Sequence, residues 1–325
     1  DNRVLAKIYL MTAGRPLEAS RKALREIGRQ VGGLVNIRGA ATTGSGRYLT
    51  GDFIGADMVI NEITAQATAA AAIDPEVDTI FEIGGQDSKY ISLDGGVVVD
   101  FEMNHACAAG TGSFLEEQAE RLGISIKGQF SQLALSSAGP IRLGERCTVF
   151  MESDLLSYQQ QGARTDDLVA GLCYSIVSNY INRVVGHRRI GQRIFFQGGT
   201  AFNLGVVSAF ERVTGRRITV PPHHEVTGAI GAAILARRYQ EQHKREKSNF
   251  GGFELADLDY SIRSFECDGC ANNCEINEVT VPGREALYYG SRCDRYNKKK
   301  DKATTADIPN LFAERHRLLL QHAGL

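Results

Sequence analysis

Two cysteines, Cys107 and Cys147, are the residues best placed for chemistry in this sequence of 325 residues. Each opens a short run that leads into a predicted helix, at about 111–122 and 148–160. The first turn of a helix carries unpaired backbone N–H groups and the positive end of the macrodipole. Both favour the thiolate, which is the form of cysteine that binds metal. The pair therefore predicts an anionic metal centre held on helix ends.

A loop suited to phosphate lies shortly before the first of these cysteines. Its two glycines lack a Cβ, so backbone N–H groups can approach a phosphate closely. Its aspartate could hold Mg²⁺ directly or through water, its glutamine could position an attacking water, and its serine and lysine could add a donor and a positive charge. An ordinary tight hairpin would use the same glycines. The candidate residues are Gly84, Gly85, Gln86, Asp87, Ser88 and Lys89.

A second glycine turn, Gly198-Gly199, follows a predicted buried strand at 193–197 and precedes a predicted helix at about 203–213. A turn in this position could seat an adenine or a ribose, with Asn203 beside it. Two adjacent glycines are weak evidence on their own.

The composition bounds the class of protein. Hydrophobic content of 43% and charged content of 23% are ordinary for a soluble globular protein. A net charge of −1 gives no reason to expect nucleic acid or a membrane surface, and no apolar run approaches the ~20 residues of a membrane span. Seven cysteines fit a reducing cytoplasm with metal-bound or free thiols. The start at Asp1 and the apolar end predict a segment of a longer protein.

The order of predicted elements indicates an α/β protein. Three short strands with glycine turns between them form an antiparallel meander, and alternating helices and strands follow, which is the order of a ribonuclease-H-like lobe. Before the meander, two strands alternate with two helices. The predicted strands are 4–11, 34–40, 79–83, 89–93, 97–101, 193–197 and 218–220, and the predicted helices are 16–31, 56–72, 111–122, 148–160, 166–185, 203–213 and 226–240.

The remaining cysteines divide into two groups. Cys173 has apolar neighbours on its helix face and is predicted to be a buried core thiol. Four others have spacing typical of metal ligands, and a structural zinc or a second Fe–S cluster is a better interpretation than four free thiols. Their spacing does not choose between the two metals. These four are Cys267, Cys270, Cys274 and Cys293.

Taken together, the segments 81–89, 103–115, 147–154 and 198–203 resemble the ATP-dependent activators of 2-hydroxyacyl-CoA dehydratases, also called archerases, and the related benzoyl-CoA reductase ATPase subunits. The resemblance covers about residues 1–240 in collinear order, and the tail resembles the larger multidomain relatives. It implies the acetate-kinase, sugar-kinase and actin fold, with two ribonuclease-H-like lobes that close on ATP. It divides the chain into 1–75, a first lobe lacking its N-terminal strands; 76–242, a second lobe with the phosphate loop and cluster helices; and 250–325, a Cys-rich segment leading to a further domain.

The resemblance also implies a mechanism. A homodimer would share one [4Fe-4S] cluster, held by Cys107 and Cys147 of each subunit, and Mg²⁺ with ATP or ADP would bind at the two glycine turns. Gln86 and Asp87 would be catalytic. ATP turnover would drive a low-potential electron from reduced ferredoxin or flavodoxin into a dehydratase or a dehydratase-like domain.

Two residues depart from the family pattern: Glu82 replaces the usual Asp, and His105-Ala106 replaces the usual Asp-Lys before the first cysteine. The alternative functions are a small-molecule kinase of the same fold, such as a sugar kinase, and a non-catalytic docking module.

Overall fold

The computed structural model describes residues 2–104, 110–144, 148–296 and 311–322. Its contacts divide the chain into two units, Asp1–Asp257 and Leu258–Leu325, and each is described by itself. The division of unit 1 into the two predicted lobes stays a prediction.

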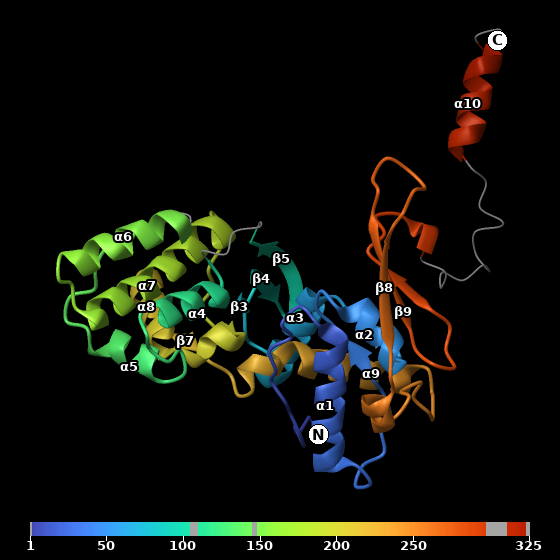
Figure 1. Cartoon of the computed structure of the whole chain (residues 1–325), viewed down its shortest axis with the longest axis horizontal. Helices are drawn as coiled ribbons and strands as arrows, with labels where there is room; N and C mark the ends of the chain where they lie inside the picture. The colour runs from blue at the N-terminus through green and yellow to red at the C-terminus, as the bar shows by residue number, and fades with distance from the viewer. Residues whose placement is uncertain (1, 105–109, 145–147, 297–310, 323–325) are drawn as a thin grey trace. The chain divides into compact units, whose positions relative to one another are not determined.

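Unit 1 is built on a five-stranded sheet with the order β5-β4-β3-β6-β7 (Figure 1). The strands β3 (Thr79–Ile83), β4 (Ser88–Asp94) and β5 (Val97–Met103) pair antiparallel and form the predicted meander. The strands β6 (Ile194–Gln197) and β7 (Ile218–Thr219) continue the sheet parallel to β3. All of β3 and β6 is buried, as expected for strands that are covered on both faces.

A layer of helices covers one face of this sheet. Four aromatic rings fill the space between strands and helices, with centroids 5.0 to 5.4 Å apart: Phe81, Tyr180, Phe196 and Phe210. Aromatic pairs at such distances add to the energy of burial. The layer consists of α4 (Gly112–Arg121), α5 (Gln129–Ser136), α6 (Thr148–Gln160), α7 (Thr165–Tyr180), which continues as a π-helical turn η2 (Ile181–Val185), and α8 (Leu204–Thr214).

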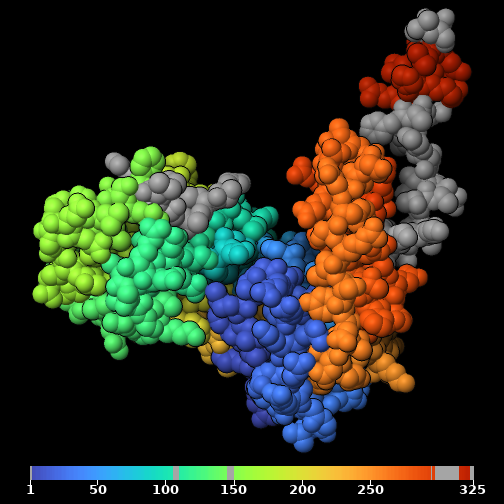
Figure 2. Space-filling model, viewed as in Figure 1, coloured from blue at the N-terminus to red at the C-terminus, as the bar shows by residue number. Residues whose placement is uncertain are grey.

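The other face packs on α3 (Glu62–Ile73), which in turn packs against α9 (Thr227–Gln242). Their contact uses small residues, because a Cβ on Gly231 of α9 would lie 1.8 Å from the carbonyl oxygen of Ala65 in α3. The helices α1 (Pro16–Val31) and α2 (Arg47–Ile54) and the short parallel strands β1 (Ala41–Thr42) and β2 (Met58–Val59) complete this side. In Figure 2 their residues are blue, and those of α4 and α5 are green.

Most predicted elements are confirmed, and three are wrong. Residues 4–11 and 34–40 form no strand, because in the described chain no neighbouring strand pairs with them. The predicted helix 56–72 begins instead at Glu62, since the side chain of Asn61 accepts a hydrogen bond from Ile63 and caps it. The helices α2 and α5 were not predicted.

Unit 2 contains a three-stranded antiparallel sheet with the order β10-β9-β8. Its strands are β8 (Ser261–Glu266), β9 (Glu275–Thr280) and β10 (Leu287–Tyr289). A small core of Ile276, Val279 and Val281 supports it, with η6 (Asp294–Tyr296) and α10 (Leu311–His322) following in the chain.

One helix of the described chain, Thr165–Val185, is long and apolar enough to cross a membrane, but 72% of its most apolar window is buried inside unit 1. That burial is typical of a core helix in a globular domain.

Candidate phosphate site at the ends of β3 and β6

The two glycine turns begin side by side in the structure. The strands β3 and β6 are parallel neighbours, and their register pairs Glu82 with Gln197. Gly84 therefore follows one strand and Gly198 follows the other at the same edge of the sheet. Ligands of open α/β sheets bind outside the carboxyl ends of the strands, at this kind of edge.

The first turn of α4 is the third part of this edge. The backbone N–H of Gly112 donates to the carbonyl oxygen of Gly84 at 2.8 Å, and that of Ser113 donates to Gly85 at 2.9 Å. A Cβ on Gly112 would lie 2.8 Å from Oγ1 of Thr200. The sequence predicts unpaired N–H groups in this first turn, but these two are hydrogen-bonded to the phosphate loop.

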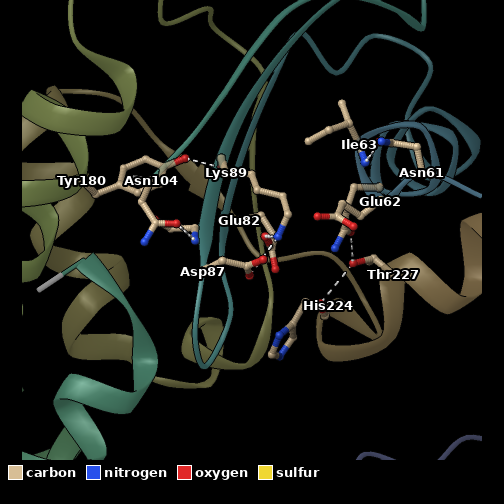
Figure 3. Close-up of polar contacts among 12 residues, drawn as sticks. Asn61, Glu62, Ile63, Glu82, Asp87, Lys89, Asn104, Tyr180, His224 and Thr227 are labelled. Atoms are coloured by element: carbon tan, nitrogen blue, oxygen red, sulfur yellow. Dashed lines mark hydrogen bonds and ion pairs between the residues drawn. The ribbon is translucent and has the colours of Figure 1, made fainter. Parts of the chain in front are cut away.

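A buried lysine lies beneath the loop (Figure 3). The ammonium group of Lys89 is 2.9 Å from Oε2 of Glu82 and 2.9 Å from Oδ1 of Asp87. Glu82 and Lys89 are 5% and 4% exposed, whereas Asp87 is partly exposed and Gln86 is exposed. Asp87 and Gln86 can thus meet a ligand from solvent, while Lys89 acts as an internal cation.

Burial and neighbouring charges act against each other in this group. Burial raises the pKa of Glu82 despite the opposing charge of Lys89. The pKa of Lys89 is also raised, since the charges of Glu82 and Asp87 outweigh its burial, which acts to lower it. The two carboxylates make the ammonium form of Lys89 more stable.

The neighbouring Ser88 is completely buried. Its N–H donates to Oδ1 of Asn104 at 2.8 Å, and its carbonyl oxygen accepts from the N–H of Asn104 at 3.0 Å. Its hydroxyl oxygen has no partner among the described residues. Ser88 therefore lies under the loop, and not at the exposed position expected for a phosphate donor.

The second turn requires glycine. Gly198 has φ +93°, and a Cβ there would lie 2.4 Å from the carbonyl oxygen of Ile83. His224, in the short helix η4 (His224–Val226), holds the turn on both sides: its carbonyl oxygen accepts from the N–H of Gly198 at 2.9 Å, and its Nδ1 lies 2.9 Å from the carbonyl oxygen of Gly198. The helix η3 (Gly199–Phe202) follows directly.

Asn203 has a structural role that was not predicted from the sequence. It is the N-cap of α8, and its Oδ1 accepts from the N–H groups of Gly205 at 3.0 Å and Val206 at 3.4 Å. Its Nδ2 is buried without a partner among the described residues. The side-chain oxygen of Asn203 is therefore occupied by the cap of α8.

Three residues near the turns were not predicted as site residues from the sequence: Gln197, Tyr9 and His224. Gln197 is fully buried, and neither of its amide atoms has a partner in the described chain. The hydroxyl of Tyr9 would lie 2.3 Å from a Cβ on Gly199. The pKa of Tyr9 is raised, first by burial and then by Glu116. Gln197 could have been predicted, because it is the polar last residue of a buried strand that leads into the glycine turn. His224 and Tyr9 reach the turns only through the tertiary fold.

The cysteines assigned to the shared cluster, Cys107 and Cys147, lie outside the described residues, as does His105-Ala106. Cys173 is buried, and burial raises its pKa to about 12, which confirms a core thiol. Among the described residues, no three His, Cys, Asp or Glu side chains are gathered as ligands of one metal ion.

The cysteines of unit 2 lie near one end of its sheet. The N–H of Cys267, after β8, donates to the carbonyl oxygen of Cys274, before β9, at 2.8 Å, and Cys270 is exposed in the turn between them. Cys293 follows β10, in which Tyr289 pairs with Asn277 three residues beyond Cys274. The structure brings the backbone of these segments together, but it does not gather the four thiols into a ligand set, and the metal site stays a prediction.

In α/β proteins, glycine turns at the carboxyl ends of parallel strands are a common place for phosphate groups to bind. The chain belongs to the BadF/BadG/BcrA/BcrD ATPase family, whose sequence profile matches residues 7–236. The resemblance stated above is thereby confirmed.

Similar proteins include dehydratase activators. The chain is 34% identical over 215 residues to the 2-hydroxyisocaproyl-CoA dehydratase activator of Clostridioides difficile, covering 66% of this chain and 79% of that protein. It is 36% identical over 184 residues to the (R)-2-hydroxyglutaryl-CoA dehydratase activating ATPase of Acidaminococcus fermentans, covering 56% and 69%. A solved structure of the 2-hydroxyisocaproyl-CoA dehydratase activator from Clostridium difficile with bound ADPNP matches with a TM-score of 0.64 and 32% identity, covering 71% of this chain and 85% of that one.

Gly198→Ala is expected to destabilise unit 1, because the new methyl group would meet the carbonyl oxygen of Ile83 in addition to the strain of a positive φ. The matched control is Gly215→Ala, which has φ +64° but no atom within 4 Å of the new methyl group. We expect the loss at Gly198 to exceed that at Gly215 by about 2 kcal/mol in urea unfolding. Equal losses would contradict the close approach of β3 to this turn.

Lys89→Met is expected to destabilise the protein by about 3 kcal/mol at pH 8, because it leaves Glu82 buried without its cation. The folded-state pKa of Glu82 is already raised, so the stability linked to its protonated form is present below its unfolded pKa and is lost as the pH rises through the folded value. Removing Lys89 raises that pKa further. The loss should therefore be smaller at pH 5 than at pH 8 in urea unfolding.

The control for this experiment is the double variant Glu82→Gln/Lys89→Met, which replaces both charges. It should lose the extra pH dependence of the single variant. If Lys89→Met instead lost the same stability at both pH values, the buried ion pair would not be the source of the effect.

Proposed function

We propose that this protein is an ATP-hydrolysing iron–sulfur activator that drives a low-potential electron into a 2-hydroxyacyl-CoA dehydratase or a related acyl-CoA reductase-type partner. The observation that carries the proposal is the convergence of the two glycine turns with the start of α4, five residues after Cys107, in a member of this ATPase family. The family supports the ATPase activity, and the names of its relatives support the dehydratase partner.

The residues at the turns fit Mg²⁺ and a nucleotide. The carboxylate of Asp87 is partly exposed and offers the hard oxygen ligand that Mg²⁺ prefers, and Gly84 beside it has no Cβ, which would lie 3.2 Å from Oδ1 of Asp87. Gln197 and Asn203 contribute buried amide atoms without partners in the described chain. These are the donors and acceptors that a sugar or base requires.

Each residue then has a distinct task. Gly84 and Gly85 give the phosphates access to the backbone, and Gly198 and Gly199 form the seat of the nucleoside. Asp87 binds Mg²⁺, and exposed Gln86 orients the attacking water. Lys89 holds Asp87 in place from below, at 2.9 Å. Ser88 supports the loop from its buried position.

Electron transfer is assigned to Cys107 and Cys147. As thiolates, two from each subunit of a homodimer supply the four ligands of a [4Fe-4S] cluster, which when bound carries the electron. Reduced ferredoxin or flavodoxin is the proposed donor, and the cytoplasm is the proposed location. Nucleotide contacts can change the cluster only if they differ between two conformations of the protein.

Cys107→Ser or Cys147→Ser is expected to abolish the visible absorbance of anaerobically purified protein and to weaken its dimer, because each change removes two of four ligands per dimer. Cys173→Ala is the matched control, since its thiol is buried in the core. It should keep full absorbance. A full complement of iron and sulfide in either serine variant would rule out the assignment.

Asp87→Ala and Gln86→Ala are expected to leave the iron content unchanged but to stop ATP-driven reduction of the acceptor. The reason is that both residues belong to the phosphate loop and neither is a cluster ligand. Asp94→Ala, an exposed aspartate at the far end of β4, serves as the control and should retain activity. Normal electron transfer in both loop variants would place catalysis elsewhere.

A structural metal in unit 2 is a separate part of the proposal, with zinc favoured over Fe–S. Four thiolates leave no open position, so the metal would stabilise the fold without catalysing a reaction. Chelation should then make residues 258–325 sensitive to protease while unit 1 stays intact, because such sites form together with the fold. A Cys107/Cys147 double serine variant that contained neither zinc nor iron and kept a resistant tail would contradict this.

The test of the whole proposal is anaerobic purification of the protein, with iron and sulfide analysis and an ATPase assay. We expect about four iron atoms per dimer and ATP hydrolysis. A colourless protein that phosphorylates a small molecule would be a kinase of the same fold.

A further inference from the structure

The described residues on either side of 105–109 are both bonded to the phosphate loop. On the N-terminal side, Asn104 lies three residues before Cys107 and exchanges two hydrogen bonds with Ser88, at 2.8 and 3.0 Å. On the C-terminal side, the N–H groups of Gly112 and Ser113 donate to Gly84 and Gly85, at 2.8 and 2.9 Å. The loop that would bind phosphate is therefore hydrogen-bonded to the chain both before and after the first cysteine.

After the cysteine, the first turn of α4 packs closely against the phosphate loop. A Cβ on Gly112 would lie 3.0 Å from the carbonyl oxygen of Gly84 and 2.8 Å from Oγ1 of Thr200. The hydroxyl of Ser113 also donates to the carbonyl oxygen of Gly85. The first turn of α4 therefore lies in close contact with Gly84 and Gly85.

The attachment before the cysteine depends on a side chain. The pairing of Lys89 with Met103 ends the β4–β5 ladder, and the backbone bond from Asn104 to Ser88 would form with any residue that has an N–H. The bond from the N–H of Ser88 is different, because its acceptor is Oδ1 of Asn104. Ser88 is completely buried, so this N–H cannot turn to water instead.

We propose that Asn104 is a positioning residue that couples the phosphate loop to the segment carrying Cys107, so that nucleotide binding at Asp87 and Gln86 is transmitted to that segment through Ser88. This inference rests on the proposed function. It assigns the coupling to one side-chain hydrogen bond next to the nucleotide site, reinforced by the backbone bonds at Gly112 and Ser113. Asn104 itself contacts neither nucleotide nor metal in this scheme.

The test is hydrogen–deuterium exchange of the whole chain with and without Mg·ADPNP, following the peptide that contains residues 105–111. Its readout does not depend on a loaded cluster or on turnover. Asn104→Ala removes the acceptor, whereas Asn104→Asp keeps an oxygen at the same position and should rescue the coupling. The matched control is Asn61→Ala, which removes an equivalent side-chain bond to a backbone N–H, also of 2.8 Å, at the start of α3.

In the wild-type protein, nucleotide should change the exchange of residues 84–88 and of residues 105–111. In Asn104→Ala the change at 84–88 should persist, and the change at 105–111 should fall below about half its wild-type size, as expected from the loss of one hydrogen bond. Asn104→Asp and Asn61→Ala should keep it within about twofold. Nucleotide affinity, measured by titration, should vary less than about threefold among all variants.

Two results would overturn the inference, and they are distinguishable. If Asn104→Ala binds nucleotide and transmits its effect to 105–111 as the wild type does, the coupling does not pass through Asn104 and the proposed function stands. If the wild-type chain itself binds no nucleotide, the proposed function fails and the inference fails with it. Loss of the response in Asn61→Ala as well would show that any destabilisation uncouples the segment, which would also contradict a specific role for Asn104.

Discussion

The parallel pairing of β3 with β6 is the constraint on which the rest of the site depends. It places Glu82 beside Gln197 and so starts both glycine turns at one edge of the sheet. The approach is close enough that a Cβ at Gly198 would meet the carbonyl oxygen of Ile83. Phe81 and Phe196 pack against Phe210 on the face of the sheet that the helices α4 to α8 cover, and this packing holds the two strands together. Both turns therefore begin from strands that are buried along their whole length.

The charge beneath the loop follows from the same geometry. Glu82 and Lys89 point to the face of the sheet that lies opposite the aromatic cluster, and the antiparallel register pairs them directly. A buried ion pair contributes little net stability, but it fixes where its partners lie. Here it keeps a cation against Asp87, which otherwise would lie beside a second carboxylate. Asp87, which is partly exposed, is thereby supported from its buried side by Lys89.

Sequence reasoning recovered the elements with local signals and missed what depends on pairing or tertiary contact. The meander at 79–101 has two glycine turns between short β-prone segments, so its strands were predicted nearly to the residue. The segments 4–11 and 34–40 also contain β-prone residues but have no neighbouring strand in the described chain, and propensity alone makes no strand. At the site, the exposed Gln86 and the partly exposed Asp87 could be predicted from the loop motif. The burial of Ser88 and the approach of His224 could not, because each depends on residues distant in the sequence. The capping role of Asn203 has a local signal, since its partners Gly205 and Val206 follow it directly and Asn is a preferred N-cap, and this signal was missed.

The central claim is that nucleotide bound at the two glycine turns alters an iron–sulfur centre held by Cys107 and Cys147. The most direct measurement is the rate at which a ferrous chelator removes iron from the anaerobically purified protein, with Mg·ATP, with ATP and no Mg²⁺, and without nucleotide. The account predicts that Mg·ATP changes this rate severalfold and that ATP without Mg²⁺ changes it far less, since Asp87 acts through the metal ion. Equal rates in all three conditions, in a protein that binds Mg·ATP and contains iron, would contradict it.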